Sequence, residues 1–380
     1  MIGWEFPPSK TGGLGTHCYE LVKNLGDKGI KVLLLVPKRS KGARKDLKNV
    51  EVIEIGSKIS SPYNAVNPNK IKPHTFEKGY GWNLFEEVKR FNKKCVKIAL
   101  GKKFDVIHCH DWMSIAAGVE LKEKTGKPLV ITIHSTEYDR TTNVYPMEYI
   151  VGREKWGMQK ADVVITVSNS MKKQLIEKYG IDESKIQVIY NGIDVFKYHG
   201  ITEKYSKIVL FLGRLTNQKG PYFFLQAAKK VLEKENDVLF IMVGRGEKMP
   251  DLINHAFHLG IMNNVIFTGF VSEEELLHAF SRASVYVMPS VAEPFGITAL
   301  EAIASGTPLI VSKNAGVSET IYHCFKTDYW DTHEMANKIV SILRYRPLQE
   351  CMRKNSFREL DSLNWGKVAD QTIGVYRRAL

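Results

Sequence analysis

The sequence has little cysteine, no long apolar run and no recognisable nucleic-acid-binding module. Its five cysteines are odd in number and scattered, which excludes a disulfide framework and predicts reduced thiols in a cytoplasmic protein. No apolar run approaches the length of a membrane-spanning helix, and nothing at the start resembles a signal peptide. The sequence also lacks the residue spacing of a zinc-binding module and the alternation of aromatic and basic residues that is typical of nucleic-acid-binding surfaces. A non-enzymatic nucleic-acid-binding protein is therefore only a remote alternative.

The composition is that of an ordinary globular protein with an excess of positive charge. The 380 residues are 44% hydrophobic and 25% charged, which is typical of a soluble enzyme and sufficient for two domains. The formal net charge of +13 favours anionic partners, from small anionic ligands to polyanions and acidic membranes.

Continuous apolar strands alternate with helices in both halves of the chain. The strands that we expect cover residues 31–36, 105–109, 128–133, 162–167, 186–189, 208–212, 238–243, 265–268, 285–288 and 309–311. This alternation predicts parallel sheets covered on both faces, and a single sheet of all these strands would already be at the usual limit of about ten. We therefore predict an α/β fold of two doubly wound, Rossmann-like domains that face a cleft. The expected boundaries are residues 1–195 and 207–363 for the domains, 196–206 for the hinge and 364–380 for a last helix.

The segment 290–312 has the most informative pattern. Helix periodicity begins at Ile297, and Gly296 stands directly before it. The free N–H groups of a helix start, at the positive end of its dipole, form an anion site. Glu293 lies in the loop before this helix and Glu301 on its flank. We interpret the N–H groups as binding a diphosphate, Glu293 the hydroxyls of a sugar and Glu301 those of a ribose.

A glycine-rich turn precedes a second helix, expected over residues 16–25. Gly12 and Gly13 let the backbone approach a bound phosphate. The dinucleotide fingerprint G-x-G-x-x-G would need a third glycine where Cys18 stands, which argues against a dehydrogenase.

The run E-P-F-G-I-T-A-L-E from Glu293 to Glu301 resembles the donor-site signature of retaining glycosyltransferases of family 4 or group 1 type. These enzymes have the GT-B architecture of two facing Rossmann-like domains, and they include glycogen and starch synthases. Other family motifs follow in order: K-T-G-G-L at 10–14, H-D-W at 110–112, T-I-H at 132–134, N-G-I-D at 191–194 and G-R-L…K-G at 213–220.

This resemblance implies a nucleotide-sugar-dependent hexosyltransferase that needs no cofactor. It implies that the reaction depends on Glu293, His134, Arg214 and Lys219. It also implies further contacts to the nucleotide sugar from Lys10, Gly12, Gly13, Val271, Phe295, Gly296, Ile297, Thr298 and Glu301. In the family, the last helix crosses back to brace the first domain.

The resemblance implies transfer of a hexose, glucose in the first instance, from an ADP- or UDP-linked donor to a glucan. A lipid or small-molecule acceptor is the alternative. For a lipid, the basic side of the amphipathic helix expected at 83–100 would contact an anionic membrane, although a solvated outer helix explains the same pattern.

We expect no metal site. The Asp-x-Asp triplet with which metal-dependent sugar transferases commonly hold Mn²⁺ or Mg²⁺ is absent from the sequence. We place His108 and His110 on opposite faces of the strand at 105–109, and no further ligand spacing accompanies them.

The start of the chain is short for this fold. Only residues 1–4 precede Glu5-Phe6-Pro7-Pro8, where such a domain normally has an apolar strand of about five or six residues. We therefore expect the natural polypeptide to begin several residues earlier, with Met1 as an internal methionine of that strand.

Overall fold

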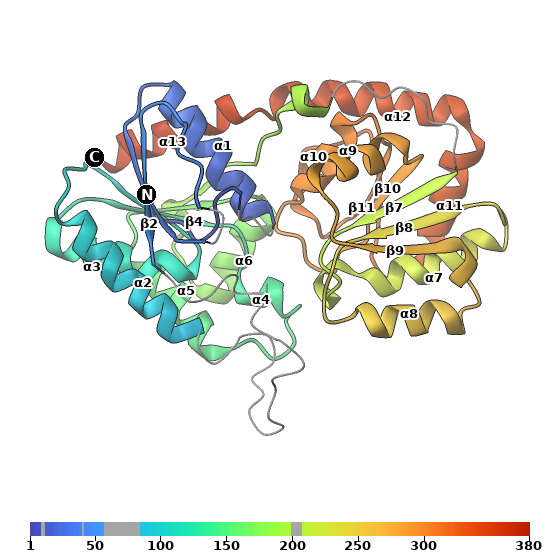
Figure 1. The fold of residues 1–380 in the computed structure, drawn as a ribbon, viewed down its shortest axis with the longest axis horizontal. Helices are drawn as coiled ribbons and strands as arrows, with labels where there is room; N and C mark the ends of the chain where they lie inside the picture. Colours follow the sequence, from blue (N-terminus) through green and yellow to red (C-terminus); the bar gives the residue numbers. More distant parts are fainter. Residues whose placement is uncertain (9–11, 40–41, 57–83, 199–206) are drawn as a thin grey trace.

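The structure is a computed structural model that describes residues 1–8, 12–39, 42–56, 84–198 and 207–380. It has two α/β halves, an N-terminal half drawn in blue to green and a C-terminal half drawn in yellow to red (Figure 1). Each half is built around a parallel sheet with helices packed on it, so the predicted fold class of two Rossmann-like units is confirmed. None of the helices in the described residues is long and apolar enough to cross a membrane.

The sheet of the N-terminal half joins a two-stranded and a four-stranded part. Its strands are β1 (Val32–Pro37), β2 (Val50–Ile55), β3 (Ile107–His110), β4 (Leu129–Ile133), β5 (Val163–Thr166) and β6 (Ile186–Val188). All the neighbouring pairs are parallel. Ile2 lies between the two parts, because it forms bridges to Leu35 in β1 and to Cys109 in β3. Its N–H donates to the carbonyl of His108 at 2.8 Å, and its carbonyl accepts from the N–H of His110 at 3.1 Å.

Six helices are described in this half: α1 (Gly13–Asp27), α2 (Leu84–Ala99), α3 (Trp112–Thr125), α4 (Glu137–Arg140), α5 (Glu148–Lys160) and α6 (Asn169–Tyr179). α2 buries its predicted apolar stripe, including Val88, Phe91 and Cys95. Its basic residues are exposed at positions 89, 90, 93, 94 and 97.

The sheet of the C-terminal half has the order β12-β11-β10-β7-β8-β9. Its strands are β7 (Ile208–Leu212), β8 (Leu239–Val243), β9 (Val265–Gly269), β10 (Val285–Met288), β11 (Leu309–Ser312) and β12 (Phe325–Thr327). Successive strands are added on both sides of the neighbouring pair β7 and β10, so the direction of strand addition reverses between these two strands. In doubly wound sheets, ligands bind outside the carboxyl ends of the strands at such a reversal point. The short edge strand β12 was not predicted.

The helices of this part are α7 (Pro221–Leu232), α8 (Met249–His258), α9 (Glu273–Arg282), α10 (Ile297–Ala304), α11 (Thr332–Arg344), α12 (Arg346–Glu359) and α13 (Trp365–Ala379). α10 begins at Ile297, as predicted, and it ends just before Gly306, which has a φ of 68°. This left-handed conformation is typical of glycine after a helix.

α13 leaves the C-terminal half and lies against the N-terminal half beside α1 (Figure 1). Its Tyr376 hydroxyl is 2.6 Å from Nδ1 of His108, and Asp370 forms an ion pair with Lys28 at 2.8 Å. Its apolar residues Val368 and Val375 are buried. The N-terminal half therefore contains in its core a helix that is distant in sequence.

Gly192→Ala is expected to weaken the attachment of α13. A Cβ at this position would lie 2.6 Å from the backbone nitrogen of Trp365, and backbone atoms cannot move aside as a flexible side chain does. We expect a loss of about 1–3 kcal/mol in the free energy of unfolding, measured by chemical denaturation. The matched control is Gly374→Ala within α13, where a Cβ would have no neighbour within 4 Å among the described residues. It should stabilise the helix by about 0.5–1 kcal/mol. A loss of stability in the control equal to that in Gly192→Ala would contradict the explanation.

Candidate functional site

The N-terminus of α10 lies at the reversal point of the C-terminal sheet, immediately after the loop that follows β10. Its cap is Gly296, with a φ of 107° and no side-chain cap. A Cβ there would lie 3.0 Å from the sulfur of Met288, so the loop approaches β10 closely at this glycine. The first backbone N–H groups of a helix have no partners within it and attract anions. This end of α10 is therefore suited to bind a phosphate group.

Tyr286 of β10 fixes the position of this helix end. Its hydroxyl is 3.0 Å from Oγ1 of Thr298 and donates to the carbonyl of Leu212, at the end of β7, at 3.3 Å. Burial raises the pKa of Tyr286, so the hydroxyl remains a donor at neutral pH. Our reading of the sequence missed this residue. A tyrosine inside an expected buried strand could have indicated it, because a buried hydroxyl requires a hydrogen-bond partner.

Two cations follow β7 at the same edge of the sheet. Nζ of Lys219 forms an ion pair with Oε2 of Glu293 at 2.6 Å, and the two side chains are 20% and 10% exposed. Nη2 of Arg214 donates to Oε1 of Gln218 at 3.3 Å. The structure thus brings three of the four predicted reaction residues, Arg214, Lys219 and Glu293, to the carboxyl ends of two neighbouring strands.

Glu301 lies one helical turn farther along α10. It is hydrogen-bonded to Tyr198, which ends a short 3₁₀ helix, η3 (Val195–Tyr198), at the start of the connection between the halves. Burial, followed by the charge of Glu301 and this hydrogen bond, raises the pKa of the Tyr198 hydroxyl. The Glu301 carboxylate, which we predicted to bind a ribose, therefore already has a hydrogen bond to the Tyr198 hydroxyl in the connecting segment.

The glycine turn of the N-terminal half lies close to the start of α10. Gly12 is the cap of α1 and Gly13 its first residue. A Cβ added to Gly13 would lie 3.5 Å from Cδ1 of Ile297, so the two helix starts meet across the two halves. Lys10, also predicted to contact the ligand, lies outside the described residues.

Phe295 and Val271 occupy different positions from the charged residues. The ring of Phe295 is buried beside Tyr190, with ring centroids 6.1 Å apart, which leaves only its backbone to face a ligand. Val271 follows β9, which lies two strands from β7 in the sheet. A ligand that reached both Val271 and α10 would have to span that distance.

His134 follows β4 at the carboxyl edge of the N-terminal sheet. Its backbone N–H donates to Oδ1 of Asp111 at 2.7 Å. Burial lowers the pKa of His134 to about 3 and raises the pKa of Asp111 to about 6. The imidazole is consequently neutral at physiological pH and can donate or accept a hydrogen bond.

The predicted orientation of His108 and His110 was wrong. Residues two apart in a strand share a face, and the rings of these two histidines stack with centroids 4.4 Å apart. His108 is held between the Tyr376 hydroxyl at 2.6 Å and Thr132 Oγ1 at 2.7 Å. His110 faces His134, its Nδ1 being 3.0 Å from Nε2 of that ring.

Glu319 connects the two halves near the site. It ends η6 (Gly316–Glu319) in the C-terminal half, and its carboxylate accepts from the backbone N–H groups of Asn169 and Ser170, both at 2.8 Å. The Tyr190 hydroxyl also donates to it at 2.9 Å. Because Asn169 begins α6, a carboxylate of one half occupies a helix N-terminus of the other, where negative charge is favoured.

Comparison with known proteins assigns the chain to a family. The model of Glycosyltransferase Family 4 matches residues 11–196, and that of Glycosyl transferases group 1 matches residues 195–359. An uncharacterized glycosyltransferase of Methanocaldococcus jannaschii is 32% identical over 100% of this chain and 98% of its own length. The glycogen synthase of Mycobacterium tuberculosis is 28% identical over 100% of this chain and 94% of its own.

Among solved structures, the catalytic domain of starch synthase IV from Arabidopsis thaliana, bound to ADP and acarbose, has a similar fold. Its TM-score is 0.76 at 18% sequence identity, covering 100% of this chain and 98% of that one. Two Rossmann-like units in this arrangement have the GT-B fold. The chain belongs to glycosyltransferase family 4, with a group 1 domain as its C-terminal half.

Glu319→Ala is expected to loosen the contact between the halves. It removes an acceptor at the start of α6, and a hydrogen bond to a charged group is worth about 1.5–3 kcal/mol. The radius of gyration of the ligand-free protein, measured by small-angle X-ray scattering, should increase. Glu274→Ala, an exposed change in α9, is the control. An unchanged radius in the Glu319 variant would mean that other contacts hold the halves together.

Proposed function

We propose that the protein is a retaining glycosyltransferase that moves glucose from ADP- or UDP-glucose to a glucan. The observation that carries the proposal is the ion pair of Lys219 and Glu293 beside the open N-terminus of α10. This edge of the sheet presents a cation, a carboxylate and several backbone N–H donors. Such a set of groups can bind a ligand that has both phosphate charge and sugar hydroxyls. A nucleoside diphosphate sugar has both.

In this proposal the diphosphate lies against the first turn of α10. The N–H groups around Gly296, Ile297 and Thr298 donate to its oxygens, and Arg214 and Lys219 neutralise its charge. Charge accumulates on the diphosphate as the bond to the sugar breaks, and fixed donors and cations stabilise it without reorganising. Because Lys219 is already paired, a bound diphosphate would share its ammonium with Glu293. We assign no covalent nucleophile.

The two glutamates would bind different parts of the donor. Glu293, in the loop before α10, contacts the transferred sugar together with His134 from the N-terminal half. Glu301, one turn along the helix, contacts the ribose in place of Tyr198. The backbone at Phe295 completes the wall on this side, and Val271 contacts the base.

Parts of both halves would enclose the donor. Gly12 and Gly13 would contact it from the N-terminal half, and the closeness of Gly13 to Ile297 supports this arrangement. Closure of the halves would exclude the water that otherwise hydrolyses the donor. We also propose a cytoplasmic location, which the odd number and scattered positions of the five cysteines support.

The glucan acceptor is supported by the relationship to a glycogen synthase, at 28% identity over the whole chain. A lipid or small-molecule acceptor is the second candidate. The exposed basic side of α2 favours it, because five cations on one helix face would bind anionic lipid.

A matrix of donors and acceptors tests the proposal. ADP-glucose, UDP-glucose and other nucleotide sugars would each be assayed with glycogen, with anionic vesicles containing candidate lipid acceptors, and with no acceptor. We expect glucosyl transfer to glycogen, and nuclear magnetic resonance of the new linkage should show the α configuration of the donor. Transfer only in the presence of vesicles would favour the second candidate. An inverted linkage would contradict retention.

Turnover is expected to continue in an excess of chelator, without added Mg²⁺ or Mn²⁺. Arg214, Lys219 and the start of α10 can neutralise the diphosphate that metal-dependent transferases neutralise with a divalent cation. EDTA should not lower the initial rate by more than about a factor of two, far less than the roughly tenfold change that 1.4 kcal/mol produces. Complete loss of activity in EDTA, restored by Mg²⁺ or Mn²⁺, would defeat the prediction.

Glu301→Ala and Glu293→Ala should affect the enzyme differently. Removing the ribose contact should weaken binding of the free nucleoside diphosphate about 10- to 100-fold, which corresponds to one or two hydrogen bonds to a carboxylate. Removing Glu293 leaves Lys219 for the diphosphate alone, so that affinity should not fall. Turnover should instead decrease by a factor on the order of 100, because a contact to the reacting sugar is lost.

Calorimetric titration with the nucleoside diphosphate measures the first effect, and initial rates at saturating donor measure the second. Glu274→Ala serves as the control in both. Equal losses of affinity in the two variants would show that the assigned roles are wrong.

A further inference from the structure

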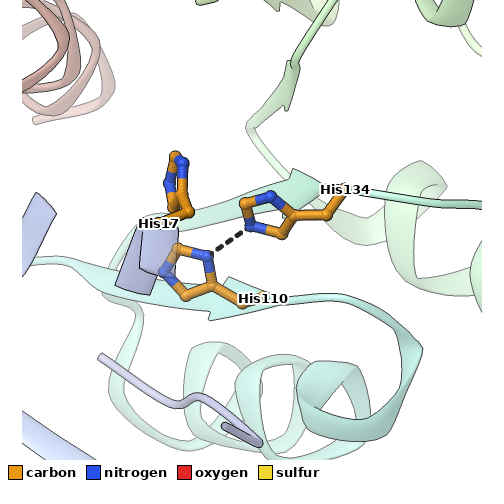
Figure 2. Close-up of side chains that lie close together, drawn as sticks. All are labelled: His17, His110 and His134. Carbon is orange, nitrogen blue, oxygen red and sulfur yellow. Dashed lines mark hydrogen bonds between the residues drawn. The ribbon is translucent and has the colours of Figure 1, made fainter. Parts of the chain in front are cut away.

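Three histidines from separate elements meet at the carboxyl edge of the N-terminal sheet. His17 lies in α1, His110 ends β3 and His134 follows β4. One ring nitrogen from each lies within 4.8 Å of those of the other two. Figure 2 shows the rings of His110 and His134 joined by a hydrogen bond, with His17 beside them. The centroids of His17 and His134 are 4.3 Å apart.

Hydrogen bonds among the three rings do not give every ring nitrogen a partner. The bond between His110 and His134, at 3.0 Å, engages one nitrogen of each. Nε2 of His17 and Nε2 of His110 are buried and have no hydrogen-bond partner in the part of the chain that the structure describes. A buried polar atom without a partner costs about 1–3 kcal/mol. Two such atoms in one cluster are available to bind a ligand.

The neighbour of His17 prepares it to coordinate a cation. Its Nδ1 is 2.7 Å from the amide oxygen of Asn191, which can only accept a hydrogen bond. The proton of a neutral His17 is therefore on Nδ1, and Nε2 presents its lone pair to the cluster. Histidines that bind metal ions are usually held in this way by a second hydrogen bond from the other nitrogen.

We propose that His17, His110 and His134 form a binding site for a divalent transition-metal ion of the zinc class. Three imidazoles suit Zn²⁺, Co²⁺ or Ni²⁺, whereas Mg²⁺ and Ca²⁺ prefer oxygen ligands. Nitrogens 2.0–2.1 Å from a tetrahedral metal lie about 3.4 Å apart. The ring nitrogens start within 4.8 Å of one another, so ring rotations that replace the hydrogen bond between His110 and His134 with bonds to the ion complete the site. The fourth position would be open to water.

This metal would not serve the proposed transfer reaction. His134 is the residue that we expect to contact the transferred sugar, so a bound ion would withdraw its ring from the donor. Occupancy should then inhibit turnover, and this consequence alone depends on the proposed function. The proposal departs from our expectation, made from the sequence, that the chain has no metal site.

Titration of the metal-free protein with Co²⁺ tests the site directly. The protein should carry no affinity tag, and Cys351→Ser should remove its exposed thiol. We expect one Co²⁺ per chain, with the intense visible absorption of a four-coordinate ion, displaced by Zn²⁺. Each of His17→Gln and His134→Gln should weaken binding by at least about 100-fold, and His323→Gln, at an exposed histidine paired with Glu359, should not.

Asn191→Ala provides a second test that leaves all three ligands in place. It should weaken Co²⁺ binding about 10- to 100-fold through loss of the hydrogen bond to His17. No visible absorption at saturating Co²⁺, or equal affinity in wild type and His17→Gln, would overturn the proposal. Bound Zn²⁺ without inhibition would instead contradict the sugar contact of His134, and the metal site would stand.

Discussion

The ion pair of Lys219 and Glu293 is the contact on which the arrangement of the proposed donor site depends. It joins the segments that follow β7 and β10, the two strands from which the C-terminal sheet grows in opposite directions. With both side chains largely covered, the pair loses much of the hydration that each charge would have alone, so it adds little to stability. Its value is that it sets a cation and a carboxylate in place before a ligand arrives.

The elements around this pair could be predicted because their sequence signals are local. Continuous apolar runs predicted the strands from β7 to β11, and the start of α10 at Ile297 followed from its periodicity. α1 begins at Gly13, earlier than the expected residue 16, because we treated the glycines as part of the turn alone. β12 was missed because it has only three residues, of which two are half-buried, and such a segment lacks a recognisable pattern.

The contacts that complete the site could not be predicted, since each joins segments far apart in the sequence. Tyr198 reaches Glu301 from the connection between the halves, and Glu319 reaches the start of α6 from the other half. His17, in α1, lies beside His134, which follows β4, and nothing in the sequence spacing predicts that these two residues meet. The stacking of His108 on His110 was predictable, because it follows from the two-residue period of a strand, and we assigned that period incorrectly.

The position of α13 has a consequence for how the chain folds during synthesis. Residues 365–379 are translated after both sheets, yet Val368 and Val375 are buried with the N-terminal half, and Tyr376 bonds to His108 in β3. Domains usually fold as units in the order in which they leave the ribosome. Here the half that emerges first is completed by a segment that is translated after both sheets, and until that segment docks the apolar surface beside α1 is open to water or to a chaperone.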